Sequence, residues 1–300
     1  MKISVVLTTY NGEKYLMPQL QSIAEQSVPA DEVLIFDDGS KDSTCSLVNG
    51  FIEENGLFAW SLIVNEKNKG WQRNFMEGIA QACGDIVLLA DQDDIWHTDK
   101  IRVMRSVFEK EPDAELVVCA YEKFRDEAVP ALDIAVSGAY HKQVSKAKNC
   151  NIIYPGCSFA FRKDFFDSIK EGWTEKYPHD ALIYMAGWVH ESIYVCEDVL
   201  HFFRRHEGSA SLAGADFSKK SRLARIERQI TAYRALTAEG SALALHRHAV
   251  RYGKWLSLRL RLLKDRSFLA GVQLLKYIFY YGSIKTWALD FLVGMKKGDV

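Results

Sequence analysis

Short apolar runs alternate with amphipathic stretches over the first 120 residues of the chain. The runs are rich in Val, Ile and Leu, a composition typical of parallel strands that are covered on both faces. They lie at 3–9, 32–36, 60–64, 85–90 and 115–121. Helices are expected between them, near 13–26, 42–54, 71–83 and 98–110. This alternation predicts right-handed βαβ units and an α/β fold, with a Rossmann-like, mostly parallel sheet flanked by helices.

The helix expected at 98–110 shows the apolar stripe most clearly. Ile101, Met104 and Phe108 recur at helical spacing, so they are expected to face the sheet. Thr98 or Asp99 is placed to cap the first turn through its side-chain oxygen.

The pattern changes after residue 121. Charges, alanines and small residues dominate 122–160, which indicates a long insertion that is either functional or mobile. GCSFAFRKDFF at 156–166 reads as a strand that runs into a helix. A helix is expected at 179–188, then two strands, SIYV and LHFFRR, and helices beyond about 216. The predicted domains are 1–215, with halves 1–120 and 121–215, and a helical extension, 216–300.

Composition narrows the class of protein. Hydrophobic content of 48% and charged content of 26% are ordinary for a folded domain, and the net charge of -1 gives no reason to expect nucleic acid. The six cysteines form no CxxC pair, and the N-terminus carries no secretory pattern, so a reduced, cytoplasmic protein is expected. No apolar run reaches the roughly 18 residues that a transmembrane helix needs.

Charge is distributed unevenly along the chain. Residues 217–266 hold 13 Lys and Arg against three acids, a local balance of +10. A basic amphipathic helix followed by YIFYYG suits an anionic membrane surface. Packing within the chain, or a homodimer interface through these helices, explains the pattern equally well. Both readings stay open at the level of sequence.

Polar loops follow four of the predicted strands: TTYNG, DDGSKDS, NEKNKGWQRN and DQDDIW. Taken singly, each could be a turn or a helix cap. Together they meet at the carboxyl edge of an open sheet, where ligands bind. The two acidic loops suit a hard divalent cation that keeps coordination positions for a phosphate. No P-loop and no GxGxxG are present, which argues against an ATPase or a dinucleotide dehydrogenase and favours a metal-bound diphosphate.

These segments, in this order, resemble the nucleotide-sugar glycosyltransferases of family 2: SVVLTTYNGEKYL, DDGSKDST, NKGWQRN and, most specifically, LADQDDIW. GCSFAFRK, the HD pair at 179–180 and FRRHEGSAS resemble the bacterial rhamnosyltransferase-like branch. The resemblance covers roughly 1–212. It implies the GT-A fold and an inverting, metal-dependent transfer from a UDP- or dTDP-sugar to a saccharide or lipid-linked saccharide in bacterial surface polysaccharide synthesis. Rhamnose is the best-known sugar of that branch, and peripheral association with the inner face of the membrane would suit such acceptors.

The resemblance also implies roles for residues that would bind the donor. Thr8, Tyr10 and Asp38 match positions that hold the nucleoside, with the ring against the base and the carboxylate on its imide N–H. Asp91 matches the first acid of the Asp-x-Asp motif, which contacts the ribose. Arg73 is a candidate for the diphosphate by charge and position alone.

Asp93 matches the second acid of that motif and, together with Asp91, is expected to hold Mg²⁺ or Mn²⁺. His206 falls where related enzymes place a residue near the metal or diphosphate, although it could instead titrate at the surface. Asp180 matches the base that deprotonates the acceptor hydroxyl, with a helix N-cap as the alternative. Asp94 is expected to cap a turn, and Trp96 to pack beneath the site.

Three other functions fit parts of the pattern. A sugar-phosphate nucleotidyltransferase shares an acidic metal site but usually has a Gly-rich, basic loop after the first strand, and TTYNGEKYL has a single Gly. A receiver-like Mg²⁺-binding regulatory module would leave about 180 residues unexplained. A glycan-binding pseudoenzyme is disfavoured because both acids of the motif and the expected base are present.

Overall fold

The computed structural model describes most of the chain. The described residues are 1–125, 131–132, 134–144, 152–175, 177–206, 218–237, 247–281 and 283–296. Clustering of contacts separates two compact units. The first comprises Met1–Gln143, Tyr154–Ser168 and Ser192–Ser209, and the second comprises Val144–Ile153, Ile169–Glu191 and Ala210–Val300. The domain boundary predicted near residue 215 lies outside the described residues.

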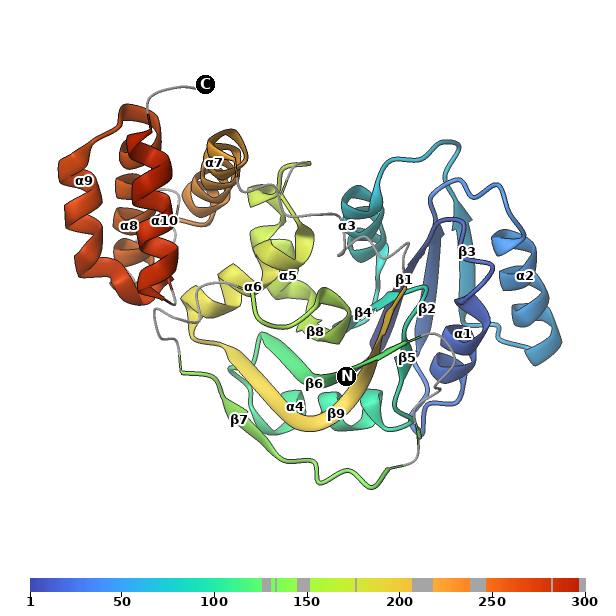
Figure 1. Cartoon of the computed structure of the whole chain (residues 1–300). Coiled ribbons are helices and arrows are strands. Elements are labelled where there is room, and N and C mark those ends of the chain that lie inside the picture. Colours follow the sequence, from blue (N-terminus) through green and yellow to red (C-terminus); the bar gives the residue numbers. More distant parts are fainter. Residues whose placement is uncertain are drawn as a thin grey trace. The chain divides into compact units, whose positions relative to one another are not determined.

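The N-terminal half of the first unit is the predicted parallel sheet (Figure 1). Its strands are β1 (Ile3–Thr9), β2 (Glu32–Asp37), β3 (Trp60–Val64) and β4 (Ile86–Asp91). They pair in the order β3-β2-β1-β4, all parallel. β1 is buried along its whole length, as expected for a strand between two neighbours and under helices on both faces.

The other half of this sheet is mixed. β8 (Phe159–Arg162) lies antiparallel between β4 and β6 (Leu116–Arg125). β9 (Ile193–Arg205) runs parallel to β6, and two short strands, β5 (Ile95–Trp96) and β7 (Tyr140–Lys142), pair with β9 antiparallel. The described residues thus form a nine-stranded sheet in the order β3-β2-β1-β4-β8-β6-β9-β5, with β7 on β9. Because β8 is antiparallel to both β4 and β6, β6 runs in the same direction as β4. The expected mostly parallel sheet is therefore confirmed, with β5, β7 and β8 as its antiparallel strands.

The two strands expected at SIYV and LHFFRR are one strand, β9. Glu197 and Asp198 interrupt the apolar run there, which made the sequence read as two strands. In the structure, shifts of register between Cys119 and Tyr121 on the neighbouring strand absorb this polar stretch. The ladder then continues to Arg205. A bulge of this kind bends a strand without ending it.

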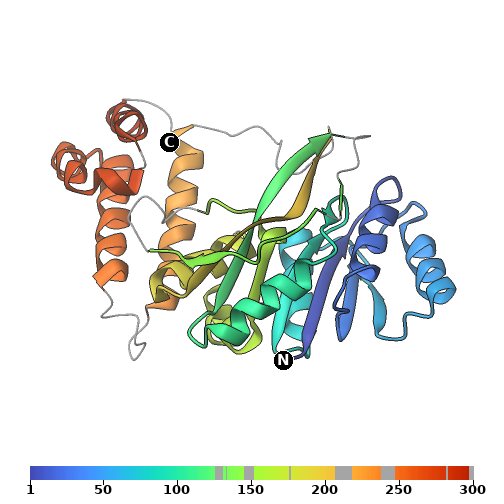
Figure 2. The ribbon, with the colours of Figure 1, turned by 90° about the horizontal axis from the view of Figure 1, so that it is seen from below.

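Helices cover both faces of the sheet. On one face lie α1 (Leu16–Ala24), α2 (Thr44–Asn55) and α4 (Lys100–Lys110), whose apolar side chains share a core with those of β1 and β4 (Figures 1 and 2). α3 (Trp71–Gln81) packs on the other face, close to β1 and β2. Gly78 permits this approach, because a Cβ there would lie 2.6 Å from Val6 Cγ1. The short 3₁₀ turn η2 (Gly156–Ser158) precedes β8, and α5 (Lys163–Ile169) follows β8 directly.

The second unit is helical. It contains η3 (Lys170–Gly172), α6 (His179–His190), α7 (Lys219–Leu236), α8 (Arg247–Asp265), α9 (Phe268–Gln273), η6 (Leu274–Tyr281) and α10 (Ile284–Met295). Aromatic rings fill its core: Trp188 contacts Tyr252 at 5.6 Å between centroids, and Trp255 contacts Tyr280 and Tyr281 at 5.6 and 5.4 Å. Among the described helices, none combines the length and the hydropathy needed to cross a bilayer.

Candidate active site

Three of the polar loops follow paired strands of the sheet. Thr8, near the end of β1, is paired with Phe36 of β2 on one side and with Asp91, the last residue of β4, on the other. Thr8 is 8% exposed, and Asp91 is half-buried. The carboxyl edge of the parallel half thus brings together the first strand, the DDGS loop and the DQD loop, as expected for this topology.

Asp38 organises the loop that connects β3 to α3. Its carboxylate is 2% exposed and accepts hydrogen bonds from the backbone N–H groups of Lys69 and Gly70, both at 2.8 Å. The side-chain amide of Asn65 donates a third bond at 3.1 Å. Gly70 has φ +88°, a left-handed conformation that glycine adopts without strain. A base N–H that contacts Asp38 would add to these three bonds.

Gln92, the middle residue of the DQD motif, ties the motif to the loop after β1. Its Oε1 accepts from the backbone N–H of Tyr10 at 2.8 Å, and its Nε2 donates to the backbone oxygen of Tyr10 at 3.2 Å. A Cβ on Gly12 would lie 2.2 Å from Gln92 Oε1, so a side chain there would displace the end of Gln92. Tyr10 is 45% exposed, so its ring is accessible to a ligand.

Arg73 lies in the first turn of α3, with 47% of its side chain exposed. Its Nε is 3.8 Å from Oε1 of Glu77, and Lys69 Nζ pairs with the other oxygen of the same carboxylate. Two cations of the NKGWQRN segment thus share one acid. The local charge is positive, as a role near a diphosphate requires.

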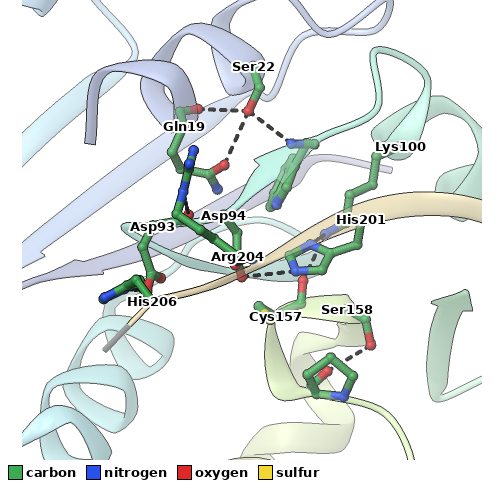
Figure 3. Close-up of polar contacts among 12 residues, drawn as sticks. Gln19, Ser22, Asp93, Asp94, Lys100, Cys157, Ser158, His201, Arg204 and His206 are labelled. Atoms are coloured by element: carbon green, nitrogen blue, oxygen red, sulfur yellow. Dashed lines mark hydrogen bonds and ion pairs between the residues drawn. The ribbon is translucent and has the colours of Figure 1, made fainter. Parts of the chain in front are cut away.

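Asp93 and His206 lie side by side (Figure 3). Asp93 Oδ2 is 2.7 Å from His206 Nε2, although 113 residues separate them in the chain. The centroid of the His206 ring lies 4.5 Å from that of Tyr15, with the two rings tilted, and the Arg204 guanidinium lies 4.9 Å from the Tyr15 ring. Arg204 Nε also donates to the backbone oxygen of Asp93 at 2.7 Å. His206 is therefore held against Asp93.

Asp94 does not cap a turn, contrary to the expectation. It is fully buried, with one carboxylate oxygen 2.9 Å from His201 Nε2 and the other accepting from the Arg204 backbone N–H at 2.9 Å (Figure 3). Burial, followed by the neighbouring Asp93 carboxylate, raises the pKa of Asp94. These bonds fasten the DQDD loop to β9, since both partners belong to that strand.

Lys100 completes this buried network. Its ammonium donates to the Cys157 backbone oxygen at 2.8 Å, lies 3.2 Å from His201 Nδ1 and sits 3.9 Å from the ring of Trp96. An ammonium that donates to Nδ1 would place the proton of a neutral His201 ring on Nε2, which faces Asp94. Burial lowers the pKa of His201 well below its usual value, which agrees with a neutral ring. Trp96 is fully buried, as expected of a packing residue.

Within the described part of the chain, Asp94, Cys157 and His201 form a cluster of atoms that could ligate a metal. The surroundings argue against a metal ion there. The Lys100 ammonium contacts His201, burial raises the pKa of the Cys157 thiol well above its usual value, and the Asp94 oxygens already accept hydrogen bonds. We interpret this cluster as a structural polar network.

Asp93 and His206 suit a divalent metal ion better, because a carboxylate and an imidazole are donors that Mg²⁺ or Mn²⁺ accepts beside water and phosphate. In the described residues, Asp91 does not join them in a cluster of three ligand atoms. Two ligands at neighbouring octahedral positions, each about 2.1 Å from the ion, would lie about 3 Å apart. The 2.7 Å between Asp93 and His206 is close to that separation. Both side chains are also partly accessible, at 22% and 16%.

Asp180 belongs to the second unit, in the first turn of α6. The N-cap of this helix is Pro178, so the alternative that Asp180 is the N-cap is wrong. Asp180 is half-buried, and burial raises its pKa to about 6. Its neighbour His179 is buried, which lowers the pKa of the ring to about 3 and leaves it neutral at pH 7. A carboxylate with a pKa near 6 is suited to accept a proton close to neutral pH.

The model of glycosyl transferase family 2 matches residues 4–169, more than half of the chain. The chain belongs to this family. It is therefore a glycosyltransferase, and the nucleotidyltransferase and the receiver-like module are rejected. The match spans the strands and loops that carry Thr8, Asp38 and the DQDD segment.

Similar curated proteins are bacterial glycosyltransferases. Glycosyltransferase GlyG of Streptococcus pneumoniae is 23% identical over 230 residues, which cover 72% of this chain and 75% of GlyG. The dTDP-rhamnosyl transferase RfbG of Shigella flexneri is 26% identical over 238 residues, which cover 73% of this chain and 78% of RfbG. The poly(ribitol-phosphate) β-N-acetylglucosaminyltransferase TarS of Staphylococcus aureus is 36% identical over 104 residues, which cover 34% of this chain and only 18% of TarS.

Solved structures share the fold of this family 2 glycosyltransferase. TarS residues 1–349 in complex with UDP-GlcNAc superpose with a TM-score of 0.64 at 16% identity, over 97% of this chain and 82% of that one. The mannosyltransferase PcManGT of Pyrobaculum calidifontis, in complex with GDP-Man and Mn²⁺, gives 0.54 at 16% identity, over 98% and 84%. The fold is the GT-A type expected from the sequence, with helices at the C-terminus.

Several residues of the family 2 site were not foreseen. In the sequence, Gln92 looks like a spacer between two acids, and His201 and Arg204 look like ordinary residues of a strand, so none of the three was expected at the site. Lys100 could have been found, because it precedes Met104 and Phe108 at helical spacing and so falls on the buried stripe of α4. Lysine on an apolar stripe indicates a buried polar partner.

Proposed function

We propose that this family 2 glycosyltransferase is metal-dependent and inverting, and that it moves a sugar from a UDP- or dTDP-sugar to a saccharide or lipid-linked saccharide during synthesis of a bacterial surface polysaccharide. The contact between Asp93 and His206 carries the proposal. It joins the second acid of the motif to a histidine that directly follows β9, and it brings together two donors for a divalent ion. The relative named dTDP-rhamnosyl transferase supports a deoxyhexose donor such as dTDP-rhamnose.

The nucleoside would be held at the carboxyl edge of the parallel strands. In this proposal Tyr10 stacks on the base, Asp38 accepts its imide N–H, and Thr8 and Asp91 contact the ribose. The exposed ring of Tyr10 supports its role, and Asp38 lies in the loop that follows the neighbouring strand β2. Arg73, partly exposed at the start of α3, would contact the diphosphate.

The leaving group is a nucleoside diphosphate, which gains negative charge as the bond to the sugar breaks. Asp91, Asp93 and His206 would hold Mg²⁺ or Mn²⁺, which when bound stabilises this charge. Arg204 supports the arrangement by fixing the Asp93 backbone and by packing against Tyr15. Both contacts limit the freedom of the ligands before the donor arrives.

Asp180 would act as the general base. The acceptor hydroxyl loses its proton to this carboxylate while its oxygen bonds to the anomeric carbon, and the bonding pair of the old linkage leaves with the diphosphate. A single displacement of this kind inverts the anomeric centre. The raised pKa of Asp180 supports the role, since it makes the carboxylate a stronger base than an exposed aspartate.

The acceptor would be reached on the cytoplasmic side, at the inner face of the membrane. The basic charge of residues 217–266 and the exposed apolar side chains of the last helices support a peripheral membrane surface. Exposed fractions are 60% for Phe268, 73% for Phe279 and 63% for Leu292. A homodimer formed through the same helices is the competing proposal, and no role for nucleic acid is proposed.

Melting temperature tests the donor site. We would measure it for the wild-type protein with UDP-, dTDP- and GDP-sugars, with and without Mn²⁺. A ligand at 100 times its Kd adds about 2.7 kcal/mol to the free energy of unfolding. For a chain of this size the midpoint should rise by several degrees, about 2–4 °C for each kcal/mol. We expect a Mn²⁺-dependent rise with one nucleotide.

Asp93→Ala should abolish the rise, whereas Glu54→Ala, which removes an exposed carboxylate of α2, should keep it. A rise that is equally large without Mn²⁺ would reject metal dependence. No rise with any nucleotide sugar would reject the donor site as proposed.

A further inference from the structure

A cavity of about 630 Å³ lies within the helical second unit. Residues of α7, α8, α9 and η6 line it. Four of them are cations that are exposed to solvent, and two are tyrosines: Arg234, Lys254, Arg261, Lys276, Tyr233 and Tyr277. Among the described residues that line the cavity, none is acidic. Its volume falls in the range of small-molecule binding sites, about 300–1,000 Å³.

The four cations differ from two arginines of the same helices. Arg222 and Arg259 are nearly buried and form ion pairs with Asp290, whose carboxylate is fully buried. For the four cations that line the cavity, the described residues show no ion pair with an acid. Like charges that converge on one cavity repel each other unless an anion joins them. The charge distribution therefore favours an anionic ligand.

The rest of the cavity surface indicates an amphiphilic ligand. Ile230 is almost fully buried and Tyr233 and Tyr277 are half-buried, so apolar and aromatic surface lies beneath the cationic rim. Phosphate carries up to two charges and several acceptor oxygens, which suits several cations better than a single carboxylate would. A phosphate joined to an apolar group matches both surfaces.

The same helices expose apolar side chains beside the residues of the cavity. η6 contributes Lys276 and Tyr277 to the lining, and its neighbouring Leu275 and Phe279 are 42% and 73% exposed. In the preceding α9, Phe268 and Leu269 are 60% and 61% exposed. Large apolar groups beside cations are typical of a surface that enters the headgroup region of a bilayer.

We propose that this cavity binds the phosphate headgroup of an anionic lipid, with the exposed apolar side chains of α9 and η6 in the adjoining acyl region. The site would keep the enzyme at the membrane surface, so its biological role rests on the proposed function. Lipid binding itself needs neither donor nor metal ion. The two proposals can therefore fail separately.

Sedimentation with vesicles tests the site. The full-length protein would be mixed with vesicles of phosphatidylcholine alone and of phosphatidylcholine with phosphatidic acid. The cavity variant is Lys254→Glu with Lys276→Glu. The matched control is Lys264→Glu with Lys285→Glu, which changes two exposed lysines of the same unit outside the cavity and alters the net charge equally. We expect the cavity variant to bind phosphatidic acid vesicles about tenfold more weakly than the control.

Circular dichroism melting would verify that both variants fold, and the Mn²⁺-dependent donor shift would report the first unit separately. Equal losses in the two variants would overturn the proposal, because the attraction would then be general to the basic surface. Failure of the wild-type protein to bind either vesicle would overturn it as well. If inorganic diphosphate bound to the cavity and vesicles did not, the ligand would be a free phosphate and the lipid assignment would be wrong. If the wild-type protein and the control variant were dimers and the cavity variant were a monomer, the cavity would be a protein interface. The lipid assignment would then be wrong.

Discussion

At the scale of single residues, acids with similar sequence contexts acquire different properties from their surroundings. Asp93 and Asp94 are adjacent in the chain, yet Asp93 is partly accessible beside His206, and Asp94 is fully buried against His201. The first can reach a ligand, whereas the second fastens the loop to β9. Neither identity nor position in the motif distinguishes the two, so this division of roles comes from the fold.

Asp180→Asn should separate catalysis from stability. The folded pKa of about 6 lies above the ordinary 3.8, so the folded protein favours the protonated acid. Stability from this group is fully present below about pH 4 and is lost as the pH rises through about 6. At pH 7.5 the asparagine variant should thus be more stable by about 2–3 kcal/mol. Melting temperatures of both proteins between pH 4 and 8 check this difference, which should vanish at the acid end.

The same substitution should lower kcat by about 10²–10⁴ if Asp180 is the base. The kcat/KM of the wild-type enzyme should rise with pH and level off above about 6, where the carboxylate is ionised. Glu171→Gln, an exposed acid of η3, serves as the control and should change neither activity nor the pH profile. A fully active Asp180→Asn enzyme would reject the role of base.

At the scale of elements, the sequence predicts those whose apolar pattern is complete. Each strand predicted in the first 120 residues is present, because continuous Val, Ile and Leu runs are typical of strands covered by helices. β3, at the edge of the sheet, is only partly buried. The antiparallel direction of β8 and the unity of β9 escape prediction, because they depend on pairing partners distant in sequence. The side-chain caps expected from Thr98 or Asp99 are absent at α4: Asp99 is the N-cap, but its carboxylate binds Ser27 and Arg102 instead.

The helices of the second unit depend on one buried acid. Asp290 of α10 pairs with Arg222 of α7 and with Arg259 of α8, at 2.7 Å in the latter case. Asp290→Asn would leave two nearly buried guanidinium groups without a counter-charge and should cost about 3–5 kcal/mol of folding free energy. Urea denaturation followed by circular dichroism measures it. Asp265→Asn, at the exposed end of α8, should change the midpoint little, and an equal effect of both substitutions would contradict the role of the ion pair.

At the scale of the whole molecule, the sequence indicates where the site lies more fully than it indicates the long-range contacts that hold the site together. The strand-end loops that carry Thr8, Asp38 and Asp91 could be foreseen, because the carboxyl edge of a parallel sheet collects whatever follows its strands. Contact between His206 and Asp93 could be foreseen only through resemblance, since β9 must cross beside β5 to bring them together. The sequence pattern predicts local structure such as strands and the loops that follow them. Contacts between distant segments can be seen only in the folded sheet.

Charge is also a property of the whole chain. The net charge is -1 while residues 217–266 carry +10, so the remaining residues sum to -11. An anionic bilayer would attract the basic region and repel the rest, which orients the protein as well as binding it.

Raising NaCl from about 50 to about 500 mM shortens the screening length several-fold, so vesicles with phosphatidic acid should release the protein. Sedimentation at each salt concentration measures the bound fraction. Retention of the protein on the vesicles at high salt would show that apolar insertion dominates the binding. The melting shift with donor and Mn²⁺, measured at the same salt concentrations, controls for loss of the fold.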